Sequence, residues 1–170
     1  MGEAGRSLED SNRQHDQGTD SVQYLTFMLA DEEYGIDILK VQEIKGWESA
    51  TPIPNAPDFV LGVTNLRGKV IPIVDLRKLF KLPGIEYGKA TVVIVVKVGY
   101  EAHSRTVGMV VDAVSEVYNI SGNMEQATPD FGGIVNTEFV KGLTAVDGKM
   151  IILLDIDKLI NIGALNLDKQ

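Results

Sequence analysis

The feature that most constrains the fold of this chain is an internal duplication. Residues 59–80 (FVLGVTNLRGKVIPIVDLRKLF) align without gaps on residues 139–160 (FVKGLTAVDGKMIILLDIDKLI), with ten identities in twenty-two positions. Upstream, residues 34–44 (YGIDILKVQEI) match residues 107–117 (VGMVVDAVSEV) in their Gly, Val and Glu and in their apolar pattern. Self-similarity of this kind indicates repeated structural units. We therefore predict two similar units in tandem, one over about 22–83 and one over about 90–163.

Each unit has the pattern of a small all-β domain. Short runs rich in β-branched and aromatic residues recur between Gly and Asp-Gly turn signals, which is typical of strands. The strands are predicted at 23–29, 34–38, 41–49, 60–64, 69–74, 91–98, 106–111, 114–120, 139–144 and 149–154. Short helical turns are expected at 58–60, 75–80 and 155–160. Five strands can close into a barrel without exposed edges, so we expect two related β-barrels, and duplicated units can exchange equivalent strands.

The two ends of the chain differ from the units. Residues 1–21 are polar, lack aromatic side chains and carry five acidic against two basic residues. Such a segment cannot bury enough apolar area to offset its ordering entropy, so it is predicted to be a disordered tail. Residues 164–170 form a predicted C-terminal tail. No N-terminal stretch resembles a signal peptide, and no apolar run approaches the ~20 residues needed to cross a bilayer.

The composition excludes several classes of function. The net charge of −8 argues against nucleic acid as a partner, because such binding rests on Lys and Arg contacts to phosphates. The absence of cysteine removes disulfides and thiolate chemistry and fits a reducing compartment. His15 lies in the tail and His103 in a polar loop, while Asp155 and Asp157 read as a helix cap and a solvated helix face. We expect no catalytic residues, no metal and no cofactor, and the default interpretation is a binding module.

The repeat separates residues that the fold requires from those that it does not. At the hairpin turn the first unit has NLR (65–67) before Gly68, whereas the second has AVD (145–147) before Gly148. Asp-Gly is a favoured tight-turn pair, so this hairpin can be made without an arginine. We assign Asn65 and Gly68 to the turn scaffold, where Gly68 is expected to need a positive φ. Arg67 is predicted to contact a partner, because arginine is enriched at interface hot spots.

Glu43 is a second candidate in the same unit. Its repeat equivalent is Glu116, which also favours the simpler reading of a surface residue at a strand edge. An ion pair between Glu43 and Arg67 would fix the rotamer of the arginine and add at most ~1 kcal/mol of stability. Two readings stay open: Arg67 touches the partner itself, or it pairs with Glu43 and shapes the surface that does.

Several spaced motifs resemble one known family. YGIDILKVQEI, the NLRG turn followed by VIPIVDLR, and VGMVVDAVSEV with GLTAVDGKMIILLDIDKL resemble the CheW-type coupling proteins of bacterial chemotaxis, over about 22–163. The resemblance implies two intertwined five-stranded SH3-like barrels without catalysis or cofactor. It also implies a cytoplasmic adaptor that joins chemoreceptor tips to the regulatory domain of the histidine kinase CheA, which carries the same fold. Such an adaptor is recruited to membrane-associated arrays without inserting into the membrane. The loop at 99–105 is longer than many members of the family need.

The resemblance also carries over individual site residues. Arg67, Glu43 and Val41 fall at positions linked to receptor or kinase binding, and Val92 and Val117 at positions linked to the receptor-facing surface. Val41 and Val117 are equally consistent with core positions, because Val41 aligns with Val114 and Val117 with Ile44.

Two alternatives come from other classes of protein. A regulatory domain fused to a chemotaxis kinase, or a phosphatase-like fusion, is disfavoured because ATP-binding and phospho-acceptor motifs are missing. A module that binds proline-rich peptides would need an aromatic groove. This alternative is disfavoured because only 6% of the residues are aromatic and Trp47 is the sole tryptophan.

Overall fold

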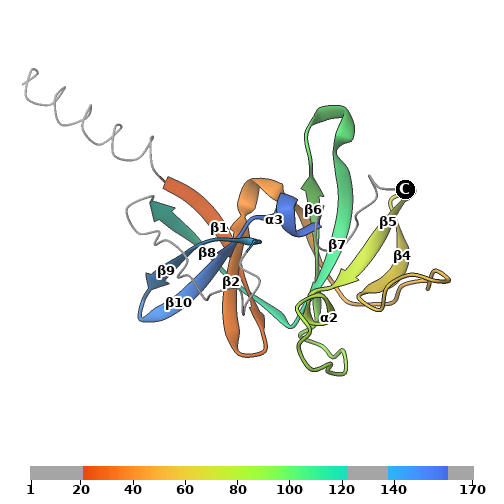
Figure 1. Cartoon of the computed structure of the whole chain (residues 1–170), viewed down its shortest axis with the longest axis horizontal. Helices are drawn as coiled ribbons and strands as arrows, with labels where there is room; N and C mark the ends of the chain where they lie inside the picture. The colour runs from red at the N-terminus through yellow and green to blue at the C-terminus, as the bar shows by residue number, and fades with distance from the viewer. Residues whose placement is uncertain (1–20, 122–137, 161–170) are drawn as a thin grey trace, which may run out of the picture.

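The structure is a computed structural model that describes residues 21–121 and 138–160 (Figure 1). Residues 164–170, and all of residues 1–21 except Ser21, lie outside the described residues. The two tails therefore remain predictions.

The described residues form strands at all ten predicted places, with ends that differ by at most three residues. The strands are β1 (Ser21–Leu29), β2 (Glu32–Asp37), β3 (Val41–Gly46), β4 (Val60–Leu66), β5 (Lys69–Asp75), β6 (Val92–Val98), β7 (Arg105–Val111), β8 (Ala113–Ser121), β9 (Val140–Val146) and β10 (Lys149–Leu154). The largest difference is at β3, which was predicted to reach residue 49. Trp47 still donates its N–H to Thr91 O at 3.1 Å, but the strand ends at Gly46 because Thr91 N–H donates to Gly88 O at 3.2 Å and not back to Trp47.

Short helical segments connect some of the strands. The predicted turns at 75–80 and 155–160 are helical as α2 (Leu76–Leu79) and α3 (Ile156–Lys158). Two 3₁₀ turns were not predicted, η1 (Ile38–Lys40) and η2 (Glu101–His103). At 58–60 the predicted turn is present but does not continue as a helix. A single tight turn is found there, in which Val60 N–H donates to Pro57 O at 3.0 Å.

The sheet topology interleaves the two sequence units. One five-stranded sheet has the order β8-β1-β2-β10-β9 and the other the order β3-β6-β7-β5-β4. Neighbouring strands are antiparallel except for β2 with β10 and β5 with β7, which are parallel. Each sheet thus combines the first two strands of one unit with the last three of the other. These observations confirm the predicted fold class, an all-β protein of two intertwined five-stranded SH3-like barrels. We call the barrel that contains β1 the first barrel and the one that contains β6 the second barrel.

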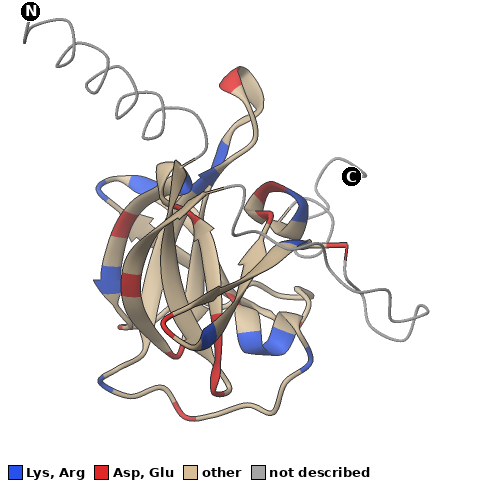
Figure 2. Cartoon of the chain, turned by 90° about the vertical axis from the view of Figure 1, so that its left-hand side faces the viewer, with Lys and Arg blue, Asp and Glu red and all other residues tan. Residues whose placement is uncertain are grey.

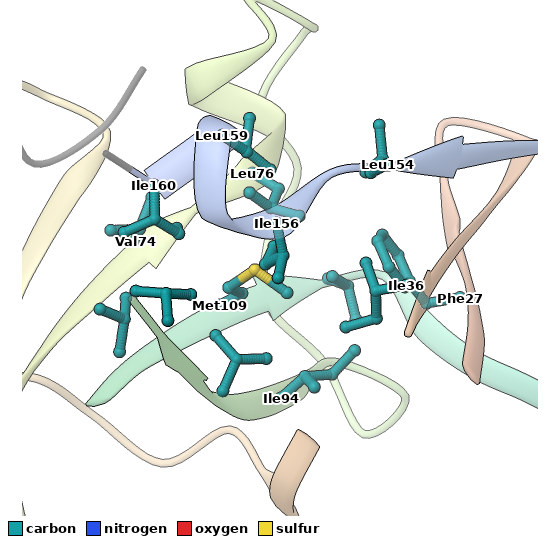
Figure 3. Packing of buried hydrophobic residues seen from close by; sticks show 14 of the residues in the cluster. Phe27, Ile36, Val74, Leu76, Ile94, Met109, Leu154, Ile156, Leu159 and Ile160 are labelled. Atoms are coloured by element: carbon teal, nitrogen blue, oxygen red, sulfur yellow. The ribbon is translucent and has the colours of Figure 1, made fainter. Parts of the chain in front are cut away.

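Strand periodicity divides the apolar residues among three cores. Along β6, Val93 and Val95 face the interior of the second barrel, whereas Ile94 and Val96 face the first barrel. A smaller cluster that includes Tyr24 and Ile151 fills the first barrel. The largest cluster, which we call the shared core, lies between the barrels and includes Phe27, Ile36, Val74, Leu76, Ile94, Met109, Leu154, Ile156, Leu159 and Ile160 (Figure 3). Because each such side chain contributes about 1.5–3 kcal/mol on burial, the two barrels are held together by core packing.

The duplicated aspartates cap the two short helices. Asp75 Oδ1 accepts a hydrogen bond from Arg77 N at 2.9 Å, and Asp155 Oδ1 accepts one from Lys158 N at 3.1 Å. In the first unit the Tyr87 hydroxyl also donates to Asp75 Oδ2. Burial and this hydrogen bond raise the pKa of Tyr87 far above its ordinary value, so the tyrosine stays protonated. The segment that connects the two units is thereby fastened to the second barrel.

A pair of charged residues joins α2 to the start of β8. Arg77 contacts Asp112 through two hydrogen bonds of 2.8 Å, from Nε to Oδ1 and from Nη2 to Oδ2. Asp112 Oδ2 also accepts the Ala30 N–H at 2.9 Å, which ties in the β1–β2 turn. Burial disfavours the charged form of Asp112, but the hydrogen bonds from Arg77 and Ala30 outweigh it and lower its pKa below the ordinary value of 3.8. Asp112 therefore links elements of both barrels.

We expect the Asp112→Asn substitution to lower the free energy of unfolding at pH 7 by about 1–2 kcal/mol, because a bidentate charged contact is lost. A carboxylate with a lowered folded-state pKa stabilises the fold above its unfolded pKa, and this contribution disappears as the pH falls through the folded pKa. The difference between the wild type and Asp112→Asn should therefore be full at pH 7 and shrink steadily below pH 3.8. Urea unfolding at several pH values measures it. A difference that does not change with pH would contradict this account.

Candidate functional site

The β4–β5 hairpin ends in a two-residue turn of Arg67 and Gly68. Leu66 pairs with Lys69 across the turn. The φ angles are 52° at Arg67 and 85° at Gly68, as a type I′ turn requires. The side chain of Asn65 accepts the Gly68 N–H at 2.7 Å, which satisfies a donor at the exposed tip. Asn65 and Gly68 thus lie where turn-scaffold residues are needed.

Arg67 occupies a backbone conformation that suits other residues better. Its φ of 52° is in the left-handed region, which costs a residue with a branched or long side chain about 1 kcal/mol. The equivalent residue Asp147 has the same φ of 52°, and aspartate tolerates this conformation more readily. The side chain of Arg67 is 79% exposed, so no burial offsets the cost. Neither the turn geometry nor burial of the side chain requires an arginine at this position.

Arg67 forms an ion pair with Glu43 across the second barrel. Arg67 Nη2 lies 3.3 Å from Glu43 Oε2. Since β3 and β4 are the two outermost strands of this sheet, the pair connects the edge strand β3 to the hairpin at the opposite edge. Glu43 Oε2 is itself buried, and no described residue donates a hydrogen bond of good geometry to it. The pair therefore orients the arginine, although a pair whose arginine is 79% exposed contributes at most ~1 kcal/mol.

A β-bulge brings Val41 and Ile44 onto one face of β3. Val41 pairs with Val96 and Ile44 with Ile94, and the pairing register shifts between Val41 and Glu43. Direct cross-strand partners point to the same side of a sheet, so Val41 and Ile44 point toward the shared core as Val96 and Ile94 do. Val41 is half-buried against that core, whereas Ile44 is 44% exposed.

The second unit repeats this arrangement on β8. Val114 pairs with Phe27 and Val117 with Leu25, again with a register shift between the two pairs. Val114 packs against the shared core, and Val117 is 48% exposed. We call Val41 with Ile44, and Val114 with Val117, the apolar strips of β3 and β8.

The structure divides the predicted site residues into two groups. Arg67 and Glu43 meet at the hairpin end of the second barrel. Val41, Val117 and Val92 lie on sheet faces toward the shared core, and Val92 is half-buried against it opposite Gly46. Ile44 was not predicted as a site residue. It is the repeat equivalent of Val117 in the sequence alignment, which could have identified it.

The residues that the structure describes also bear on metal sites, the cavity of the second barrel and membrane spans. Residues 21–121 and 138–160 contain no group of three or more His, Asp or Glu side chains that could hold a metal ion. The cavity inside the second barrel, beside Trp47 and Ile71, has a volume of about 20 Å³, which is room for one water molecule at most. Within the same residues no helix is long and apolar enough to cross a membrane. Basic and acidic residues are interspersed over the ribbon (Figure 2).

The described residues form two intertwined SH3-like barrels that present apolar strips and a charged hairpin. Comparison with known proteins places this architecture in a class of scaffold proteins. The family model described as the CheW-like domain matches residues 23–163. A chemotaxis protein CheW from Klebsiella aerogenes is 48% identical over 139 residues, which are 82% of this chain and 81% of that protein. The chemotaxis protein CheW of Rhizobium meliloti is 41% identical over 133 residues, 78% of this chain and 83% of its own.

A solved structure shows the same fold. The crystal structure of the scaffolding protein TtCheW from Thermoanaerobacter tengcongensis superimposes with a TM-score of 0.73 at 36% sequence identity and covers 83% of this chain and 93% of that one. The chain belongs to the CheW-like family of chemotaxis scaffold proteins.

Proposed function

We propose that this chain is a non-enzymatic adaptor that couples chemoreceptors to the histidine kinase CheA. The observation that carries the proposal is Arg67, an exposed arginine in a left-handed turn position whose repeat equivalent is an aspartate. A non-glycine residue held at a cost in backbone energy is a reason to look for a function. Membership of a family of chemotaxis scaffold proteins supplies the class of partner.

An adaptor needs two surfaces that can be occupied at once. We place the receptor contact on the apolar strips, because exposed Ile44 and Val117 suit the apolar face of a helix in a receptor tip. We place the kinase contact at the Arg67 hairpin, where a charged, exposed tip suits a partner barrel of the same fold. The adaptor acts in the cytoplasm and is recruited by these contacts to membrane-associated arrays.

The experiment that tests the function uses three purified proteins: the full chain, the regulatory domain of the kinase and a cytoplasmic receptor fragment from the same bacterium. Calorimetry and size-exclusion chromatography should show binary complexes with each partner and a ternary complex with both. Failure to bind either partner would overturn the proposed function.

We expect that Ile44→Ser together with Val117→Ser weakens binding of the receptor fragment about tenfold or more, because both exposed apolar contacts are lost. Binding of the kinase regulatory domain should not change. Ile85→Ser is the matched control, since Ile85 is 46% exposed but lies outside the strips. Thermal melts of all variants should agree within a few degrees. Equal loss of receptor binding in the control and in the double variant would contradict the role of the strips.

A further inference from the structure

The β6–β7 hairpin is longer than the equivalent hairpin of the other unit. In β1–β2 the chain turns through only Ala30 and Asp31, between the paired residues Leu29 and Glu32. In β6–β7 the last pair is Val98 with Arg105, and six residues (99–104) form the loop. The hairpin extends beyond the other strands (Figure 1) and is the uppermost ribbon in Figure 2. Because two residues are enough to connect the equivalent strands β1 and β2, formation of the barrel does not require the extension.

Contacts to two other elements hold the base of this extension. Asp157 of α3 accepts the Gly99 N–H through Oδ1 at 2.8 Å. Its Oδ2 lies 2.9 Å from Nζ of Lys40 in η1. The same Nζ lies 5.3 Å from the centroid of the Tyr100 ring, in a cation–π contact. The hydrogen bond that Lys40 donates to Asp157 raises the pKa of Lys40, so the lysine keeps its charge. Asp157 thus holds both the hairpin and Lys40 in place, whereas the sequence predicted a solvated side chain.

The β6–β7 loop and the neighbouring η1 turn expose apolar side chains to solvent. Tyr100 is 75% exposed and Leu39, next to Lys40, is 86% exposed. These two values are the highest among the large apolar side chains that the structure describes as exposed. An aromatic ring fixed in place and left in water is typical of an interface, where Tyr provides contact area at a small entropic cost.

The exposed residues lie beside the N-terminal end of the apolar strip of β3. Leu39 precedes Val41 by two residues, and the contact with Lys40 brings Tyr100 beside the same segment. From Ile44 to Val41 the strand spans roughly 10 Å, and the 3₁₀ turn η1 adds about 4 Å up to Leu39, so Leu39 lies within about 14 Å of Ile44 along the chain. This distance is less than three turns of an α-helix, so one helix of three turns is long enough to contact both ends.

We propose that Tyr100 and Leu39 form a receptor-binding extension of the β3 strip, which contacts the same helix one to two turns beyond Val41. The inference rests on the proposed function, since it assigns the receptor to this strip. Lys40 and Asp157 are positioning residues that hold the Tyr100 ring in place.

The test is Tyr100→Ser in the full chain, with affinities for the cytoplasmic receptor fragment and for the kinase regulatory domain measured by calorimetry. Receptor affinity should fall about five- to tenfold while kinase affinity stays the same. The matched control is Met150→Ser, because Met150 is 50% exposed at a hairpin of the first barrel. A second variant replaces residues 99–104 by Asn-Gly, which suits a two-residue turn, and should lose receptor affinity to at least the same extent.

The outcomes separate this inference from the proposed function. If Ile44→Ser weakens receptor binding but neither Tyr100→Ser nor the shortened hairpin does, the extension is not part of the contact and the inference is overturned alone. Loss of kinase affinity with intact receptor affinity would also overturn it. If the wild-type chain binds no receptor fragment, the proposed function fails and this inference fails with it.

Discussion

Replacing Gly62 with alanine should lower the free energy of unfolding by about 3 kcal/mol or more, which is a large part of the roughly 5–15 kcal/mol typical of a folded domain. The φ of Gly62 is 140°, which disfavours any residue with a Cβ. A Cβ built there would lie 2.0 Å from Thr51 O and 2.5 Å from Thr51 C, so the clash is with backbone. Relief would require Thr51 to move away from Val63, and two hydrogen bonds of 2.8 and 2.9 Å join these residues. The side of the second barrel between Thr51 and β4 would then open.

Chemical denaturation followed by the fluorescence of Trp47 measures this effect, because Trp47 packs against the core of the second barrel. Gly46→Ala is the control, since a Cβ at Gly46 meets nothing within 4 Å. The control should keep the stability of the wild type within about 1 kcal/mol. A Gly62→Ala variant as stable as the control would show that the Thr51 segment can move freely.

Arg67→Asn is expected to separate binding from folding. The free energy of unfolding should change by less than about 1 kcal/mol, because the lost ion pair with Glu43 is offset by a residue better suited to a left-handed φ. The affinity for the kinase regulatory domain should fall about ten- to a hundredfold, the range for an arginine at the centre of an interface. Calorimetry measures the affinity, and a thermal melt reports the stability of the same sample.

The repeat provides the matched control for this variant. Asp147→Asn changes the equivalent turn residue, which has the same φ of 52°, and should leave kinase affinity unchanged. A loss of stability above about 2 kcal/mol in Arg67→Asn would make the arginine a structural residue. Unchanged kinase affinity would remove the hairpin from the proposed contact.

The strands could be predicted because duplication made each one visible twice. A continuous run of apolar residues, such as residues 93–96, indicates a strand buried on both faces, and the structure places these side chains in two different cores. The interleaved sheet order follows from pairings between residues far apart in the chain, for example Leu25 with Val117. Local sequence patterns do not report such pairings, so strand exchange between the two units could be stated from the sequence only as a possibility.

The site could be predicted in part. Arg67 was identified because the two turns could be compared residue by residue. Ile44 was missed and the exposure of Val117 was undecided, because each strand contains a β-bulge. The extra residue of a bulge breaks the alternation of side chains, so the residues after it point to the opposite face from the one expected. A bulge leaves no clear pattern in the sequence. The position of Tyr100 depends on Asp157, which is 57 residues away in the chain. Asp157 comes close to Gly99 and Lys40, and so to Tyr100, only in the folded protein.

The interleaved topology also determines when this protein can fold during its synthesis. β1 pairs with β8 and β2 with β10, so the first barrel lacks partners until almost the whole chain has left the ribosome. The second barrel must likewise wait for β6 and β7. Contacts of such long sequence separation slow folding and leave unpaired strand edges open to aggregation in the meantime. A nascent or truncated chain that ends after the first unit therefore has no complete barrel, and one that ends after β7 has only the second.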